Sequence, residues 1–194
     1  MRTPRHLRQS ILVAIATVAI TAGVLSAQTV WTKSAANPVL PAGSPGRYDA
    51  ALACDAWVLK GKDGRYEMWY SAQATADGPC QIAYAWSPDG MNWRKQGVVL
   101  GTGSGWDAYS VQRPCVIVDR TAPARQRYKM WYTGTDAAGG PAAIGFATSP
   151  NGKAWTRHQD NPVLQADGVA GGPDALVGTV VREGEGYTIW YAVG

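Results

Sequence analysis

Short apolar segments alternate with polar turns along the chain after residue 27. The segments are rich in aromatic and β-branched residues and are bounded by Gly, Pro, Asp and Asn, which is typical of strands. No window beyond residue 27 sustains the period of an amphipathic helix. The pattern therefore predicts an all-β fold.

Two sequence motifs recur at a nearly constant spacing. Residues 66–70 (YEMWY) return at 128–132 (YKMWY) and 187–191 (YTIWY), so the copies lie 62 and 59 residues apart, and SPDGMNW at 87–93 returns as SPNGKAW at 149–155. The Asp-Gly and Asn-Gly pairs in the second motif favour tight turns, which predicts a hairpin at each copy. Repeats of this length indicate one supersecondary unit used several times. Four short antiparallel strands per unit predict the blades of a β-propeller.

The repeat also predicts how the chain is organised. Residues 31–40 resemble the last strand of a unit and are expected to act as a closing strand, 50–100 form a first blade, 107–164 a second, and 174–194 the start of a third. This is about two and a half blades, whereas closed propellers have about four to eight. We therefore expect the remaining blades to come from a longer chain, with self-association of a half-ring as the alternative.

The first 27 residues have the three-part pattern of a secretory signal peptide. Arg2, Arg5 and Arg8 precede an apolar run from residue 11 to residue 25, and small residues follow at 26 and 27. The run is shorter than the roughly 20 residues that span a membrane. We expect residues 28–194 to be secreted or periplasmic, without a stable membrane partner. An uncleaved membrane anchor is the alternative, because Leu25 fits a cleavage site poorly.

Charge and cysteine content narrow the possible partners. Without the three arginines of the leader, 15 basic residues stand against 14 acidic ones, which does not favour nucleic-acid binding. Export permits disulfides. Cys54 and Cys80 are expected at the same end of the first blade, so they can form a disulfide; three unpaired thiols, with Cys115 inside an apolar strand, are the alternative. Neither a Cys-x-x-Cys pair nor a histidine cluster marks a metal site, and no cofactor is expected.

Candidate chemistry gathers where the first strand of each blade begins, on a side that we call the upper face. Aligning residues 48–58 with 106–116 matches Asp49 with Asp107, and Asp55 with Arg113, while the shortened third copy offers Asp174. A recurring Asp often bonds loop backbone, so Asp55 and Arg113, where the copies differ, are the better site candidates. Converging carboxylates suit glycoside hydrolysis. Tyr48, Trp106 and Tyr109 are placed to stack on sugar rings.

Taken together, the YxMWY strands, the SP(D/N)GxxW turns and the Asn-Pro-Val-Leu run resemble the five-bladed propeller glycosidases. This group includes arabinanases, β-xylosidases, invertase-like fructosidases and mannoside phosphorylases, and the resemblance covers nearly all of residues 31–194. It implies a carbohydrate substrate, with Asp55 as base or nucleophile and Asp107 as a supporting carboxylate. In the hypothesis of a glycan-acting propeller, we further expect Arg113 to bind a substrate hydroxyl, or a phosphate in a phosphorylase, and Asp49 to lie beside the substrate.

The resemblance is incomplete at one position. The general acid in this group is commonly a Glu at the start of the third blade, where this chain has Asp174, which could substitute as a supporting catalytic carboxylate. Three functions follow from the sequence: a glycoside hydrolase or phosphorylase, a sugar-binding propeller without turnover, or a structural or protein-interaction propeller. An inactive fragment is a further alternative.

Overall fold

The computed structural model describes residues 31–165 and 174–193. The chain divides into two units, residues 1–33 and 34–194, and every described strand belongs to the second. The predicted leader lies outside the described residues. No helix in the described ranges combines the length and the apolar character that a membrane span requires.

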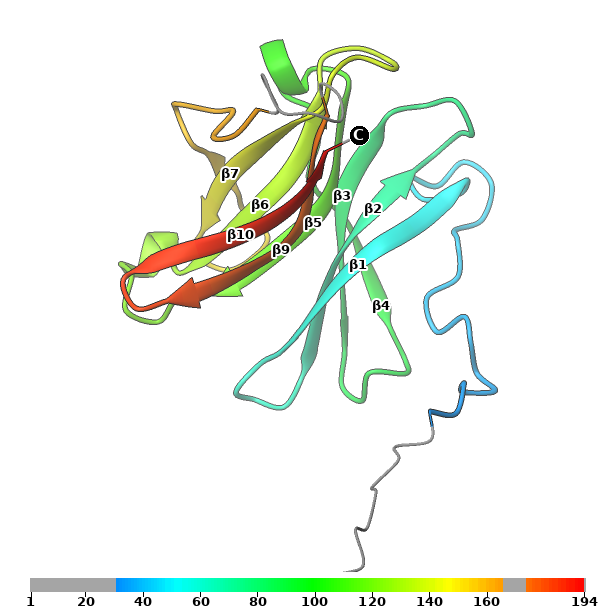
Figure 1. Ribbon diagram of the computed structural model, residues 1–194. Coiled ribbons are helices and arrows are strands. Elements are labelled where there is room, and N and C mark those ends of the chain that lie inside the picture. Colours follow the sequence, from blue (N-terminus) through cyan, green and yellow to red (C-terminus); the bar gives the residue numbers. More distant parts are fainter. Residues whose placement is uncertain (1–30, 166–173, 194) are drawn as a thin grey trace, which may run out of the picture. The chain divides into compact units, whose positions relative to one another are not determined.

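Ten described strands form three antiparallel sheets (Figure 1). In the first two sheets, sequential neighbours pair in order, and the third sheet is a hairpin. The strands are β1 (Leu52–Lys60), β2 (Tyr66–Gln73), β3 (Cys80–Ser87) and β4 (Arg94–Leu100) in the first sheet, β5 (Ser110–Val118), β6 (Tyr128–Thr135), β7 (Ala143–Ser149) and β8 (Thr156–Arg157) in the second, and β9 (Ala175–Glu183) and β10 (Gly186–Val193) in the third. The predicted all-β fold with four-stranded antiparallel blades is confirmed.

Residues 31–40 differ from the sequence-based expectation. They were expected to form a closing fourth strand, but this segment contains only coil, a turn and a bend. A strand needs the backbone groups of a partner strand to complete its ladder, and these residues pair with none of the described strands. Leu40 instead packs against the buried residues of the first sheet.

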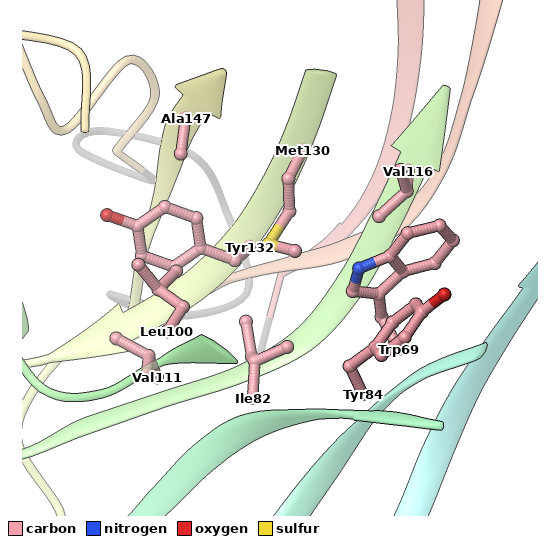
Figure 2. Close-up of a cluster of buried hydrophobic side chains, with 9 residues drawn as sticks. All are labelled: Trp69, Ile82, Tyr84, Leu100, Val111, Val116, Met130, Tyr132 and Ala147. Atoms are coloured by element: carbon pink, nitrogen blue, oxygen red, sulfur yellow. The ribbon is translucent and has the colours of Figure 1, made fainter. Parts of the chain in front are cut away.

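The repeated aromatic strands form the core between the first two sheets (Figure 2). Trp69 and Tyr132, from two copies of the YxMWY motif, are fully buried, and both pack in this cluster with Ile82 and Met130. Burying one such side chain contributes about 1.5–3 kcal/mol. The Trp69 Nε1 donates a 2.7 Å hydrogen bond to the Gly152 carbonyl of the next sheet. The motif therefore forms the packing contact between the first two blades.

The SP(D/N)GxxW segments are self-contained turns. In the first, Ser87 Oγ accepts a bond of 2.9 Å from the Gly90 N–H, and Asp89 Oδ1 accepts bonds from the next two backbone amides. Backbone donation from Asn92, first among several hydrogen bonds, holds the pKa of Asp89 well below its usual range. Trp93 closes the turn through a 3.0 Å bond to the Gly90 carbonyl. These bonds account for the motif as a structural turn.

The three cysteines are free thiols in the structure. The expected Cys54–Cys80 disulfide is absent because the two residues lie on β1 and β3, with β2 between them. Two strand spacings of about 4.8 Å exceed the Cα separation of about 4.4–6.8 Å that a disulfide allows. Cys115 is fully buried and packs against the third sheet.

Candidate functional site

A β-bulge interrupts the first strand of each of the first two sheets. The pairing with the second strand shifts between Cys54 and Trp57 in β1, and between Gln112 and Cys115 in β5. Asp55 and Arg113 sit at the two bulges, and they are the non-glycine residues with positive φ in the described chain, at 48° and 54°. A left-handed non-glycine residue costs on the order of 1–3 kcal/mol and often marks a functional site.

A serine from the second strand joins the two bulges. Arg113 N–H donates a 2.9 Å hydrogen bond to Ser71 Oγ, and the Ser71 hydroxyl donates a 3.1 Å bond to Asp55 Oδ2. The Asp55 and Arg113 residues are nevertheless exposed to solvent. The structure therefore places a carboxylate and a guanidinium on adjacent first strands, with Asp55 held through its carboxylate and Arg113 through its backbone N–H.

The thiol of Cys54 lies beside this carboxylate. Burial, reinforced by the hydrogen bond to Asp55 and its negative charge, raises the pKa of Cys54 to about 12. The thiol is therefore protonated at neutral pH and donates to Asp55 Oδ2 across 3.3 Å. Asp55 Oδ2 thus accepts from two neighbours, which orients the carboxylate.

The third sheet has a bulge at the equivalent position but no charged side chain there. Pairing between β9 and β10 shifts at Gly178, and the Val177 N–H donates a 3.0 Å bond to Thr133 Oγ1, just as Arg113 donates to Ser71. Val177 is buried and apolar. Three equivalent positions therefore carry a carboxylate, a guanidinium and a buried aliphatic side chain, so the polar character is confined to the first two.

Asp49 and Asp107 occupy equivalent places away from the first strands. Asp107 is 1% exposed; its Oδ2 accepts bonds of 3.0 Å from Tyr132 Oη and 2.7 Å from Arg157 Nε. Asp49 is also 1% exposed, and its Oδ2 is bonded to Tyr70 Oη and paired with Lys95 at 2.5 Å. We call each set an Asp–Tyr–cation clasp.

The clasps give both aspartates a structural role. Each clasp ties the start of a blade to its second and outermost strands through a carboxylate that is 1% exposed, and Asp107 also borders a hollow of about 440 Å³. The expected roles of Asp107 as a supporting catalytic carboxylate and of Asp49 beside the substrate stay predictions. Each buried carboxylate lies within 4 Å of a cationic side chain, Lys95 for Asp49 and Arg157 for Asp107, and this pairing offsets the cost of burying the charge.

Asp174 is part of a second repeated link between sheets. Its Oδ1 accepts a 2.8 Å bond from the Ala142 N–H, and the equivalent Ser110 Oγ accepts one of 3.2 Å from the Cys80 N–H. Asp174 also borders a hollow of about 390 Å³ on the upper face, together with Tyr109 and Gln112. The residue is half-buried, so it combines a structural bond with access to this hollow.

The three aromatic candidates differ in how open they are. Trp106 is wedged over Tyr132 at 5.6 Å between ring centroids, and a Cβ added at Gly134 or Gly145 would lie 2.5 or 2.6 Å from its indole. Its ring is half-buried and borders a hollow of about 440 Å³, so its stacking on a sugar stays a prediction. The Tyr48 hydroxyl lies 3.3 Å from that of Tyr70, beneath the first clasp.

Tyr109 is the aromatic candidate that reaches the hollow. Its hydroxyl donates a 3.2 Å bond to the Asp77 carbonyl of the first sheet, which positions the ring at the boundary between the two sheets. Ser71 and Gln112 were not selected from the sequence. The sequence did carry a signal for Ser71: a hydroxyl residue directly follows the YxMWY motif in two copies, as Ser71 and as Thr133.

The described ranges contain no group of three or more His, Cys, Asp or Glu side chains arranged to hold a metal ion. The polar groups at the bulges are instead one carboxylate, one guanidinium, one hydroxyl and one thiol. Such a set can bind hydroxyl groups and anions through hydrogen bonds, and its carboxylate can accept a proton or attack a carbon centre.

No family model matches the chain. Two uncharacterized proteins from two strains of Mycobacterium tuberculosis are each 36% identical to it over 104 residues. The match covers 51% of this chain and 32% of each relative, so the chain spans about a third of the length of the curated proteins that it matches.

Solved structures show the same arrangement of blades. A beta-1,2-mannobiose phosphorylase from Listeria innocua superposes with a TM-score of 0.62 at 19% identity, covering 74% of this chain and 42% of that one. A second structure, described as a member of a mannoside phosphorylase family that contains glycoside hydrolases targeting beta-1,2 mannosidic linkages in Candida mannan, gives 0.62 at 17%, covering 82% and 52%. A putative glycoside hydrolase from Parabacteroides distasonis gives 0.58 at 16%, covering 81% and 50%. The chain therefore has the blade fold of the five-bladed propeller glycoside hydrolases and mannoside phosphorylases.

Proposed function

We propose that this chain is part of an exported protein that acts on a glycan through the bulge residues Asp55 and Arg113. The observation that carries the proposal is the pair of left-handed bulges, joined by Ser71, with opposite charges open to solvent. Strained backbone that other parts of the fold hold in place is typical of sites that bind or react. The fold neighbours support a carbohydrate ligand, because their names describe a mannobiose phosphorylase and glycoside hydrolases.

In this proposal Asp55 acts as the general base or nucleophile, and Arg113 binds the substrate. A guanidinium can hold a sugar hydroxyl, or a phosphate in two parallel hydrogen bonds if the reaction is phosphorolysis. Glycoside cleavage also needs a proton donor at the leaving oxygen. Among the described acidic candidates, Asp174 is the one that lines the hollow of the upper face, and we assign it this role within the proposal.

A second candidate function is sugar binding without turnover. It is favoured by the fate of the other two carboxylates, since Asp107 is enclosed in a clasp and Asp174 already accepts a backbone hydrogen bond. A binding module would use Arg113, Asp55 and the ring of Tyr109 and would need no proton donor.

One assay separates the two functions. The protein is incubated with aryl glycosides and with β-linked manno-oligosaccharides, each with and without inorganic phosphate, and products are followed alongside glycan-array binding. Turnover that Asp55→Asn abolishes supports the catalytic proposal. Glycan binding that Arg113→Gln weakens, without turnover by the wild-type protein, supports the binding module. Full turnover by Asp55→Asn, or neither binding nor turnover in the wild type, would overturn the proposal.

A further inference from the structure

A second hollow lies at the opposite ends of the strands, which we call the lower groove. It has a volume of about 810 Å³ and runs between the first two sheets, within the range of about 300–1,000 Å³ typical of ligand sites. The β1–β2 turn and the ends of β2 and β3 supply one wall, and the β5–β6 loop, the start of β6 and the β7–β8 turn supply the other. Both walls belong to the described chain.

The lower groove concentrates positive charge. Six cationic side chains line it against two carboxylates, Asp63 and Glu67, which gives the groove a formal charge of +4; the six are Lys60, Lys62, Arg65, Arg120, Arg127 and Lys153. The chain beyond residue 27 is by contrast nearly neutral, with 15 basic and 14 acidic residues. Charge is therefore gathered here rather than spread over the surface.

Most of these cations have no carboxylate partner. Arg65 pairs with Asp63 at 3.4 Å. Within residues 31–165 and 174–193, no carboxylate oxygen lies within 4 Å of the charged groups of the other five. Like charges held in one concave site raise the local potential and attract anions. The unpaired cations come from both walls, so an anion in the groove would contact two blades at once.

The floor of the groove is polar and held in place from both blades. Glu67 accepts bonds of 2.9 Å from Tyr84 Oη and 3.1 Å from Tyr128 Oη, one to each carboxylate oxygen. Burial, with the nearby Glu67 adding to it, raises the pKa of Tyr128 to about 12, so this phenol remains a donor. The Arg65 guanidinium lies over the Trp86 ring at 5.1 Å, and Lys153 lies over Tyr84 at 5.0 Å.

From these observations we propose that the lower groove binds an anionic glycan strand, at a site separate from the bulge residues. Cations on both walls would pair with carboxylate or sulfate groups, while the Glu67 carboxylate at the floor would accept hydrogen bonds from sugar hydroxyls. A nucleic acid fits less well, because its denser phosphates would meet the two carboxylates of the groove. The site does not depend on the catalytic assignment of Asp55.

Binding of labelled oligosaccharides by fluorescence anisotropy tests this proposal. The probes are an oligogalacturonate as the carboxylated glycan, a heparin oligosaccharide as the sulfated one, a neutral manno-oligosaccharide, and a single-stranded oligodeoxynucleotide. At least one anionic glycan is expected to bind more tightly than the neutral probe and the oligonucleotide. Its affinity should fall as salt is raised from 0.05 to about 0.5 M, where exposed charges are screened over a few ångströms.

Two double variants with the same change in charge locate the site. Lys62→Gln with Arg127→Gln removes one cation from each wall and is expected to weaken binding about tenfold, a loss of about 1.4 kcal/mol. Lys33→Gln with Arg47→Gln removes two exposed cations that do not line the groove, and should leave the affinity within about twofold, since scattered exposed charges contribute little. Thermal melts of both variants confirm folding.

The proposal would be overturned if neither anionic glycan bound, if both double variants lost affinity equally, or if the oligonucleotide bound most tightly. Tighter binding of the oligogalacturonate would indicate a carboxylated ligand, and tighter binding of the heparin oligosaccharide a sulfated one.

Discussion

At the scale of single residues, Asp55 and Arg113 show that equivalent backbone positions can carry opposite chemistry. Both have left-handed φ values at a bulge, and both bulges are tied to Ser71. Asp tolerates this conformation better than Arg, because its short side chain can bond locally. The strain at Arg113 is therefore expected to be the larger of the two.

Two substitutions at Arg113 separate its strain from its charge. Arg113→Gly and Arg113→Ala both remove the guanidinium, but only glycine adopts φ 54° without a steric penalty. We expect the glycine variant to have a free energy of unfolding about 1 kcal/mol higher than that of the alanine variant. Urea denaturation measures the difference, and both variants should lose glycan binding equally. An alanine variant as stable as the glycine variant would show that the bulge is not strained.

At the scale of elements, the Asp–Tyr–cation clasps fasten the start of each blade to its outer strands. The second clasp joins the 3₁₀ helix Gly105–Asp107 to β6 and to β8. Strand β8 is only two residues long. Burial, with Asp107 adding to it, raises the pKa of Tyr132 well above its usual range, so the phenol donates at all physiological pH values. The clasp thus compensates for a short outer strand.

Removing one donor from a clasp should lower stability. Tyr132→Phe leaves the buried Asp107 carboxylate with Arg157 as its side-chain partner, and we expect a loss of about 1–3 kcal/mol in the free energy of unfolding. Tyr66→Phe is the matched control, because the Tyr66 hydroxyl makes no hydrogen bond to any other described residue. Denaturant unfolding measures both variants. Equal free energies of unfolding for Tyr132→Phe and Tyr66→Phe would mean that the tyrosine of the clasp does not contribute to stability.

The strands could be predicted because the signals for them are local. The YxMWY and SP(D/N)GxxW motifs carry their own alternation and turn residues, so their positions followed from the repeat. The clasps could not be predicted in the same way, since Arg157 meets Asp107 across 50 positions of sequence. The bulges were also hidden, because Ala56 and Pro114 interrupt the alternation without marking a turn. The sequence comparison still singled out Asp55 and Arg113, since the two copies differ there.

At the scale of the whole molecule, each sheet covers the tryptophan of the sheet before it. Trp69 is fully buried against the second sheet, and Trp131 is 9% exposed and packs on the third, with its ring 5.0 Å from that of Tyr187. The equivalent Trp190 on β10 is 52% exposed. A further blade packed in the same way would cover it, and the presence of such blades in a longer protein stays a prediction.

The contact between the second and third sheets contains a carboxylate that couples stability to pH. Asp119 accepts a 2.6 Å bond from Tyr187 Oη and a 2.9 Å bond from Arg182 Nη1. The Tyr187 bond, followed by that of Thr121, holds the pKa of Asp119 well below its usual range. A depressed pKa stabilises the folded state above the unfolded value of about 3.9, and this stabilisation is lost as the pH falls below that value.

Asp119→Asn should therefore change the acid branch of the stability curve. Between pH 6 and pH 2 we expect the melting temperature of the wild type to fall more steeply than that of Asp119→Asn, which starts lower at pH 6. Asp63→Asn, at an exposed position paired with Arg65, is the control and should follow the wild type. If the melting temperatures of the wild type and Asp119→Asn fell in parallel with pH, Asp119 would not be a source of the pH dependence.

The most direct test compares the aspartate at the first bulge, Asp55, with the aspartate in the second clasp, Asp107. Glycan turnover and melting temperature are measured for Asp55→Asn and Asp107→Asn in the same protein, using the glycan that the wild type cleaves or, if it only binds, the glycan that it binds. We predict that Asp55→Asn loses turnover or binding with little change in melting temperature, whereas Asp107→Asn lowers the melting temperature and retains function when folded. Full function in Asp55→Asn, with loss of function in a stably folded Asp107→Asn, would contradict the assignment of the bulge as the site.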